Sequence, residues 1–97
     1  METNGQKETE KINISFTNEG TINKNSVCLE TEKGSIKLFF SYSTIISFSG
    51  GGDCGTIENL WSVTTGKFLN ELEPDKKERL NEPEFKERLR TALNKLF

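Results

Sequence analysis

Histidine is absent from this 97-residue sequence, and its absence excludes several kinds of catalysis. Without an imidazole the chain has no Ser–His or Cys–His pair, so proton transfer would fall to Glu, Asp or Lys. Cysteine is also scarce, because Cys28 and Cys54 are the only two. A structural zinc site needs four Cys or His ligands, and the carboxylates show no calcium-loop spacing. The sequence therefore predicts a protein that is not an enzyme and that needs no metal or cofactor.

An excess of charge of one sign and a long apolar run are lacking as well. The 13 Lys and Arg residues are interspersed among 15 Asp and Glu residues, for a net charge of −2. That balance does not match the clustered basic surface of a protein that binds duplex DNA. No apolar run approaches the roughly 18 residues of a membrane-spanning helix, and the opening METNGQKETE is unlike a signal peptide. The chain is expected in the cytoplasm, where its two thiols stay unpaired.

Hydrophobic residues make up only 32% of the chain, so a compact core is expected. The residues expected to form it are Phe16, Val27, Leu29, Leu38, Phe40, Ile46, Phe48, Trp61, Leu69, Leu72, Phe85, Leu89 and Leu93. Each of these side chains stabilises the fold by roughly 1.5–3 kcal/mol when fully buried, before the entropy cost of ordering it. A core of this size supports a marginal domain, which a partner or a self-dimer would stabilise further.

The chain begins with a polar segment and then enters a strand pattern. Residues 1–9 carry no apolar residue after the first methionine and are expected to be disordered, which leaves one domain over residues 10–97. Ile12, Ile14 and Phe16 alternate with polar residues. This period of two predicts a half-buried strand.

A hairpin spanning residues 26–40 is expected next. Its first strand covers 26–31, and the glycine-containing connection that follows predicts an antiparallel return. The third strand runs over 35–48 and is rich in β-branched and aromatic residues. Consecutive apolar residues interrupt its alternation. Either both of its faces are covered, or a bulge or bend near 41–43 divides it in two.

The middle of the chain changes from strand to helix. Residues 49–55, SGGGDCG, are expected to form a flexible hairpin tip, because three consecutive glycines have too much backbone freedom for a strand interior. A short strand over 56–63 follows. Helical spacing then predicts a short helix that begins near Thr64 or Thr65 and ends before Pro74.

The last element is an amphipathic helix over residues 82–97. Asn81 is a natural N-cap, and Pro83 fits the first helical turn, where its missing N–H costs little. The charged segment 75–80 before it has the composition of a connection or of one helical turn. Four to five strands followed by two helices predict an α+β fold with a small antiparallel sheet. Both helices are expected to cover one face of that sheet.

The segment Thr64-Thr65-Gly66-Lys67 resembles the end of a phosphate-binding loop. A nucleotide-binding loop of this kind requires a second glycine five positions before Gly66, where this chain has Trp61. A weaker anion site stays open, because the free N–H groups of a helix start can hold an anion beside a lysine. The simpler interpretation is that one of the two threonines is the N-cap of the short helix.

Aromatic residues offer a second candidate surface. Phe39, Tyr42 and Trp61 could share the sheet face that the core leaves uncovered. If exposed, Tyr42 and Trp61 would suit a protein interface or a base-stacking surface, because each combines a large ring with a polar group. The alternative is that these rings are buried in a core that needs every large side chain.

Two segments carry a resemblance to a known family. SYSTIISF at 41–48 and WSVTTGKFLN at 61–70 are similar to a Ser-Tyr-x-Thr-x-Ile-x-Phe strand and an aromatic-Ser-x-Thr-Thr-x-Lys-His-x-Asn segment. These motifs resemble those of small uncharacterised proteins of phages, plasmids and archaeal mobile elements, over about residues 36–72. Phe68 stands where the family pattern has histidine. The resemblance implies a mobile-element origin and carries no established activity.

Three functions follow as hypotheses. The first is a non-enzymatic protein that binds a host protein or complex in the host cytoplasm, for instance as an inhibitor of a defence system such as a CRISPR effector. The second is a protein that binds nucleic acid or phosphate through the Thr64–Lys67 helix start, which the charge balance does not favour. The third is a self-assembling accessory subunit, with a homodimer left open. The residues expected at an interaction surface are Tyr42, Thr44, Trp61, Thr64, Thr65, Lys67 and Asn70.

Overall fold

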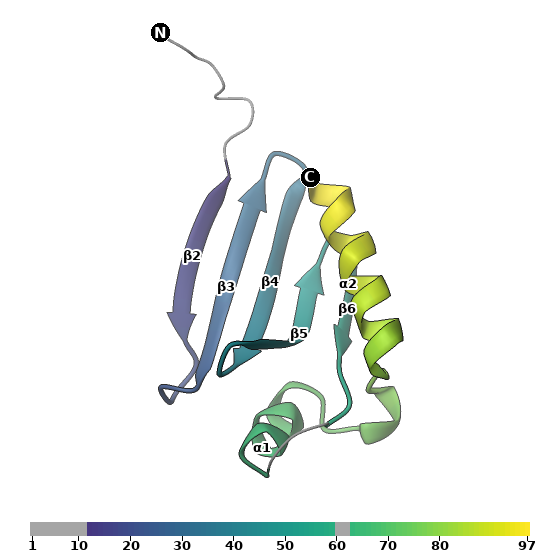
Figure 1. Ribbon diagram of the computed structural model, residues 1–97. Coiled ribbons are helices and arrows are strands. Elements are labelled where there is room, and N and C mark those ends of the chain that lie inside the picture. The colour runs from purple at the N-terminus through teal and green to yellow at the C-terminus, as the bar shows by residue number, and fades with distance from the viewer. Residues whose placement is uncertain (1–11, 60–62) are drawn as a thin grey trace, which may run out of the picture.

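The computed structural model describes residues 12–59 and 63–97, and it describes side chains for 12–59 and 65–97 (Figure 1). The strands are β2 (Asn13–Asn18), β3 (Lys24–Thr31), β4 (Gly34–Ser41), β5 (Thr44–Gly50) and β6 (Asp53–Thr56). They form one antiparallel sheet in the order β2-β3-β4-β5-β6. The helices α1 (Val63–Leu72) and α2 (Glu82–Leu96) follow, with a 3-10 turn η2 (Lys76–Glu78) between them. The α+β prediction is confirmed.

Tight turns join the three central hairpins. The predicted connection between β3 and β4 is confirmed. A turn at Tyr42–Ser43 divides the strand predicted over 35–48 into β4 and β5, which confirms the alternative of a bend near 41–43. A register shift between Phe39 and Phe40 adds a bulge just before that turn. The two parts of the predicted strand, β4 and β5, therefore pair with each other as a hairpin.

The glycine-rich segment is shorter as a loop than the sequence predicts. Only Gly51 and Gly52 form the turn, with φ of 63° and 81°, and Asp53 already begins β6. Two central residues with positive φ are typical of a type I′ hairpin turn, which favours glycine at both positions. Gly50 belongs to β5, so the predicted loop over 49–55 is corrected to a tight turn.

The strand predicted over 56–63 is also wrong. β6 ends at Thr56, Ile57 makes a single parallel bridge with Leu80, and α1 begins at Val63. The remainder of that segment, including Trp61, lies outside the described residues, as does the N-terminal segment predicted to be disordered.

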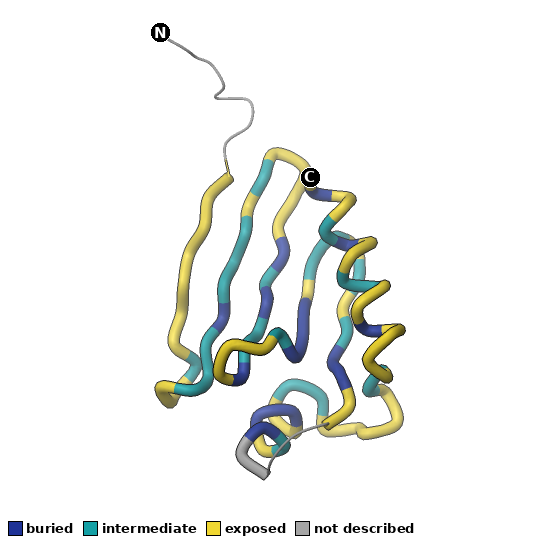
Figure 2. The backbone as a smooth tube through the Cα atoms, viewed as in Figure 1, coloured by how far each residue is buried: buried dark blue, intermediate teal, exposed yellow. Residues whose placement is uncertain are grey.

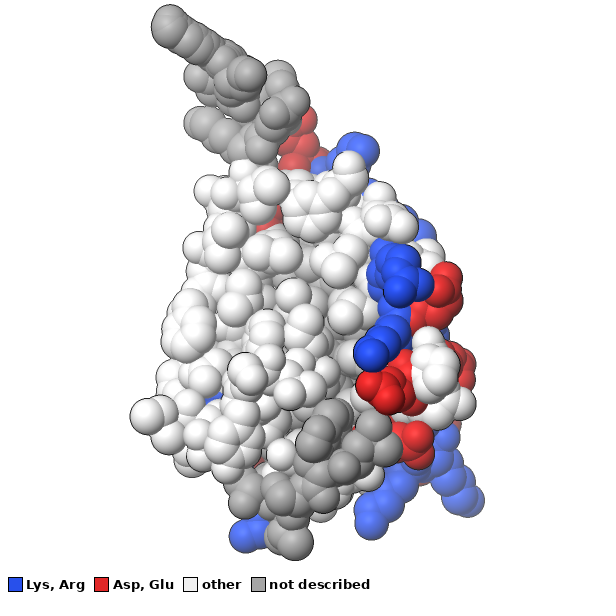
Figure 3. Space-filling view, viewed as in Figure 1, with Lys and Arg blue, Asp and Glu red and all other residues white. Residues whose placement is uncertain are grey.

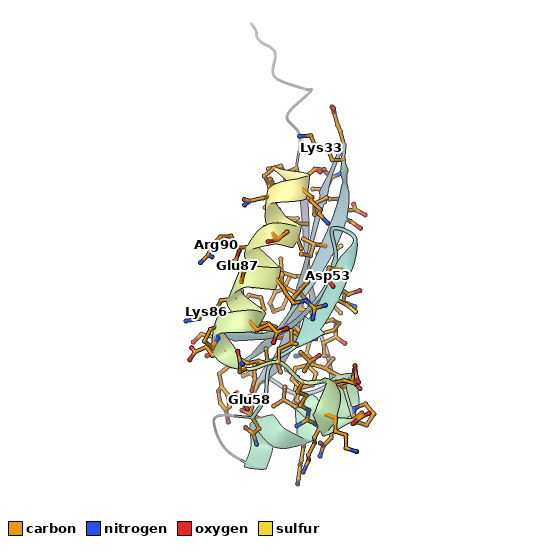
Figure 4. All side chains as sticks on the ribbon, turned by 90° about the vertical axis from the view of Figure 1, so that its right-hand side faces the viewer. Lys33, Asp53, Glu58, Lys86, Glu87 and Arg90 are labelled. Atoms are coloured by element: carbon orange, nitrogen blue, oxygen red, sulfur yellow. The ribbon has the colours of Figure 1, made fainter. Side chains whose placement is uncertain are left out.

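The C-terminal helix α2 forms as the sequence predicts. The side chain of Asn81 accepts a hydrogen bond from the Glu84 N–H at 2.9 Å, which satisfies one of the free donors of the first turn. Phe85 is buried, and its ring lies 5.8 Å from that of Phe48 on β5. In the view of Figure 4, α2 lies against one side of the sheet, and its Arg90 points away from the sheet. The helix contacts β4 and β6 and leaves β2 uncovered.

The short helix α1 contacts the other side of the sheet. Its Phe68 ring lies 6.5 Å from the ring of Phe39, in an edge-to-face arrangement. Phe39 is next to Leu38 in the strand, and neighbouring strand residues point to opposite faces. Leu38 belongs to the face that α2 covers, since it is paired with Phe48. The expectation that both helices cover one face is therefore wrong.

The core lies between α2 and the sheet and continues to α1 (Figure 2). Its buried hydrophobic residues are Ile36, Leu38, Ile46, Phe48, Ile57, Phe68, Leu69, Phe85, Ala92 and Leu96. The predicted core residues that are only half-buried are Val27, Leu29, Phe40, Leu72, Leu89 and Leu93. Phe16 is 68% exposed, so its prediction as a core residue is wrong for the single chain. Cys28 and Cys54 are unpaired, as expected.

Candidate functional site

The Thr-Thr-Gly-Lys segment lies inside α1 and not before it. Because α1 begins at Val63, Thr64 and Thr65 are both helical, and the interpretation of either as the N-cap is wrong. Thr65 is buried, and its hydroxyl oxygen lies 2.9 Å from that of Ser41 at the end of β4. This pair of hydroxyl groups fastens the helix to the sheet, so the Thr65 side chain faces inward.

The side chain of Asn59 lies so close to Gly66 that it explains why this position has a glycine. A Cβ atom at this position would lie 2.9 Å from the side-chain nitrogen of Asn59. A distance this short would force the Asn59 amide to move. The glycine of the motif therefore provides space for Asn59, and it needs no phosphate ligand to explain it.

Lys67 and Asn70 lie on the outer side of α1, beside a polar groove of about 470 Å³. The groove is lined by Glu58, Asn59, Gly66, Lys67, Asn70, Lys76 and Arg79, which bring three cations and one carboxylate together. Arg79 donates one hydrogen bond to the side-chain oxygen of Asn70, at 2.6 Å, and another to the carbonyl of Glu73, at 3.1 Å. The groove thus has a positive balance, although Arg79 and Asn70 already contact each other.

Tyr42 is the exposed tip of the β4–β5 turn. It has φ of 57°, and it is the one residue other than glycine with a positive φ in the described ranges 12–59 and 63–97. Its N–H donates to the carbonyl of Asn23 at 2.9 Å, which joins this turn to the β2–β3 connection. Its side chain is 55% exposed, and Thr44 beside the turn is exposed as well.

The structure brings part of the predicted surface together. The bond between Ser41 and Thr65 places the β4–β5 turn against α1, so the turn and the helix form one corner of the molecule. We call this surface the corner, and its exposed predicted residues are Tyr42, Thr44, Lys67 and Asn70. Trp61 and the side chain of Thr64 lie outside the described part of the chain. Phe39 does not join an exposed aromatic surface, because it packs against Phe68.

Sequence reasoning missed a second surface, on the sheet face that carries α2. Strand pairing places Ile14, Leu29 and Ile36 in one row across the sheet and Phe16, Val27 and Leu38 in the next. Burial decreases along each row away from α2. Ile36 is fully buried and Leu38 is 7% exposed, whereas Ile14 is 69% and Phe16 is 68% exposed. We call Ile14, Phe16, Val27 and Leu29 the open half-face.

The open half-face carries no charge. The charged residues of β3, Lys24 and Glu30, have the opposite parity in the strand and therefore point to the other face. Figure 3 shows this side of the molecule as a broad, mostly white surface with few Lys, Arg, Asp or Glu side chains, bordered on the right by the charges of α2. The alternation of Ile14 and Phe16 was the signal that could have revealed it, but that alternation alone cannot tell what covers the apolar face.

One charged pair links α2 to the sheet edge. Arg88 donates to both carboxylate oxygens of Asp53, at 2.7 and 3.1 Å, and to the carbonyl of Cys54 at 3.2 Å. The hydrogen bond from Arg88 lowers the pKa of the Asp53 carboxyl below its ordinary value, and the N–H of Cys54 adds to this effect. This pair holds the helix to β6 and is not part of the corner.

The fold and its surfaces define a small α+β protein with an antiparallel sheet, an exposed polar corner and an uncharged open half-face. The chain belongs to a family of unknown function (DUF8033), whose model matches residues 9–87. No curated protein and no solved structure matches the chain. Within the described ranges, no helix has the length and apolarity to cross a membrane, and no three Cys, Asp or Glu side chains gather as metal ligands.

Proposed function

We propose that this protein is not an enzyme and that it acts by binding a host protein through the corner. The observation that carries the proposal is Tyr42, a large exposed side chain at a backbone conformation that favours glycine. A positive φ in a tight turn is a conformation that glycine adopts without steric cost. A tyrosine at left-handed backbone costs about 1–2 kcal/mol.

That cost is not offset by burial, because the ring is more than half exposed to solvent. A strained residue that adds nothing to the core is best explained by what its side chain contacts outside the chain. Tyrosine is enriched in protein interfaces, since its ring offers apolar area and its hydroxyl a hydrogen bond. Lys67 and Asn70, on the outer side of the adjoining helix α1, are exposed as well.

The particular role that we propose is inhibition of a host defence complex, such as a CRISPR effector, in the host cytoplasm. The resemblance of segments 41–48 and 61–70 to proteins of phages, plasmids and archaeal mobile elements supports this origin. Both segments contribute to the corner, so the family-like residues and the exposed tyrosine belong to one surface. A small protein that occupies a surface of a larger host complex needs no catalytic centre.

The test is retention of a host protein by the immobilised full chain and by two single-residue variants. We expect the wild type and Ser43→Gly to retain one host protein at a near-stoichiometric level, and Tyr42→Gly to lose it. Ser43 is the matched control, because it is the other residue of the same turn. Circular dichroism must show both variants folded. Absence of a near-stoichiometric partner, or equal retention by Tyr42→Gly, would refute the proposal.

A second candidate function is binding of nucleic acid or phosphate in the polar groove. Lys67, Lys76 and Arg79 line it with a single carboxylate, Glu58, which favours an anionic ligand. Such binding would weaken as salt concentration rises and would be lost in Lys67→Ala. Lys33→Ala on the distant β3–β4 turn is the control. Unchanged affinity in Lys67→Ala would exclude the groove as the site.

A further inference from the structure

We infer that the open half-face is the interface of a symmetric homodimer, in which a second copy of this chain covers it. Strand pairing places its residues in the same two rows as the buried core residues Ile36 and Leu38. The helix α2 covers the end of each row that lies on β4, and the end on β2 stays exposed. Apolar rows that stay exposed in the single chain mark an interaction surface. This inference does not depend on the corner or on the function proposed for it.

The chemistry of the surface restricts what can cover it. No charge is available on Ile14, Phe16, Val27 or Leu29 to recognise a charged partner, so the covering surface must itself be apolar and uncharged. The chain has such a surface in the open half-face itself. Two copies can therefore meet there without repulsion and without an unpaired buried charge.

The two edges of the sheet differ in a way that agrees with this arrangement. At the β6 edge, Arg88 donates to the carbonyl of Cys54, and Leu80 exchanges backbone hydrogen bonds with Thr56 and Glu58. At the β2 edge, the strand NISFTN contains no charged residue and no proline. Natural proteins usually protect an exposed edge strand with a charged residue, with a proline or by covering it with another element. Within the described ranges 12–59 and 63–97, the edge without these features is that of β2, beside the open half-face.

The distance by which α2 rises above the sheet matches the distance between two packed sheets. A helix with its side chains is roughly 10–12 Å across, and packed sheets lie about 10 Å apart. A second sheet placed on β2 and β3 would therefore lie level with α2. Only a twofold axis running along the strands brings the two open halves together without a clash between the two α2 helices. The α2 of each copy then lies beside the β2 edge of its partner.

In this arrangement the partner also contacts the side of α2 that carries Leu89, Leu93 and Phe97. Leu89, Leu93 and Phe97 repeat every four residues and so share one side of the helix. Arg88 faces β6, which places that flank on the side toward β3. Phe97 is 55% exposed, and Leu89 and Leu93 are half-buried. These three residues extend the apolar surface of the open half-face, and an interface of the standard size of roughly 800 Å² per partner would also include residues around them.

The experiment is the solution mass of the full chain by sedimentation equilibrium, for the wild type and two variants. We expect the wild type at twice its 11.0 kDa chain mass. Phe16→Glu places a charge in the interface and should raise the dissociation constant by about 100-fold or more, so that the monomer dominates. Thr17→Glu puts the same charge on the same strand but on the opposite face, and it should remain a dimer.

Each other outcome overturns the inference. A wild type that is monomeric at every concentration leaves no dimer to explain, and if such a monomer binds a different protein through Phe16, the occupant is foreign. Equal dissociation of Phe16→Glu and Thr17→Glu would indicate edge-to-edge pairing of β2 and not packing of the faces. Circular dichroism confirms that both variants are folded. Tyr42→Gly should keep the dimer mass, so a failure of the corner proposal is distinguishable from a failure of this one.

Discussion

The segment Thr64-Thr65-Gly66-Lys67 shows how a motif can be explained by the contacts of its single residues. Thr65 bonds to Ser41, Gly66 leaves space for Asn59, and Lys67 lies in a groove beside two other cations. Thr65 and Gly66, which suggest a phosphate loop in the sequence, are thus explained by the packing of α1 against the rest of the chain. Only Lys67 among the described side chains of the segment is available to a ligand, which is why its substitution tests the groove.

At Tyr42 we expect the exchange Tyr42→Gly to leave stability unchanged or to raise the free energy of unfolding by up to about 1 kcal/mol. Glycine relieves the strain of the positive φ, and its greater freedom in the unfolded chain offsets part of that gain. Urea denaturation of the two proteins measures the difference. Ser43→Gly should instead destabilise by about 0.5–1 kcal/mol, because no positive φ is relieved there. A clear loss of stability in Tyr42→Gly would show that its ring has a structural role.

Signals confined to a few residues could be predicted from the sequence, and signals that depend on distant residues could not. Asn81 caps α2 as expected, because an N-cap involves only the next three residues. The burial of Phe16 depends on which strands α2 covers, and nothing in the pattern around Phe16 contains that information. Tyr42 was expected at an interaction surface, and a bend near 41–43 was only one of two alternatives, since tyrosine is not a typical turn residue.

At the scale of elements, the β5–β6 hairpin depends on a close contact with β4. Gly50 has φ of 142°, and a Cβ atom there would collide with the carbonyl oxygen of Ser35 and with Ile36. Gly20 has a similar φ of 134°, but a Cβ atom there would meet nothing within 4 Å. The two glycines therefore separate backbone strain from steric collision.

We expect Gly50→Ala to lower the free energy of unfolding by about 2–4 kcal/mol, since strain and collision both contribute. Gly20→Ala should lower it by only about 1–2 kcal/mol, from strain alone. Thermal or urea denaturation compares the two variants directly. Equal losses would mean that β4 and β5 can separate enough to accept a methyl group, contrary to the tight pairing of Ile36 with Gly50.

The contact between α2 and β6 should depend on pH through Asp53. Because Arg88 lowers the pKa of Asp53 in the folded state, its stabilisation is complete above the unfolded value of about 3.9 and is lost as pH falls through the lower folded value. The pair is partly exposed, so Asp53→Asn should cost only about 0.5–1 kcal/mol at neutral pH. The difference from wild type should vanish in acid. Glu87→Gln, which removes an exposed pair with Arg90, is the control and should cost less.

The order of strands and helices along the chain was largely predictable, and their positions relative to one another were only partly predictable. Alternation and helical spacing identified β2, β3, the segment of β4 and β5, and α2, because these patterns are repeated over many residues. β6 was not identified, because it lies in the segment expected to be a loop. The sequence left a bend near 41–43 open as one of two alternatives and could not decide for a hairpin, because the turn contains no glycine, asparagine or proline. The side of the sheet on which α1 lies depends on long-range contacts such as Phe39 with Phe68, which the pattern of α1 alone does not contain.

At the scale of the whole molecule, the five strands are wider than the single helix that covers their apolar face. A 97-residue domain with few hydrophobic residues has a small stability margin, so leaving two apolar rows half-covered is expensive. Dimerisation through the open half-face resolves this imbalance. The uncovered rows then belong to a core that two chains share, and the prediction of Phe16 as a core residue would hold for the dimer.

If the chains share a core, thermal stability must depend on protein concentration, because unfolding is then coupled to dissociation. A tenfold increase in concentration favours the folded dimer by about 1.4 kcal/mol, which should raise the melting temperature by roughly 3–5 °C for two chains of this length. Calorimetry over a hundredfold concentration range measures this shift. Phe16→Glu should melt at a lower temperature that does not change with concentration, whereas Thr17→Glu should keep the dependence of the wild type. A melting temperature of the wild type that is constant over that range would mean that the open half-face stays exposed in the folded protein.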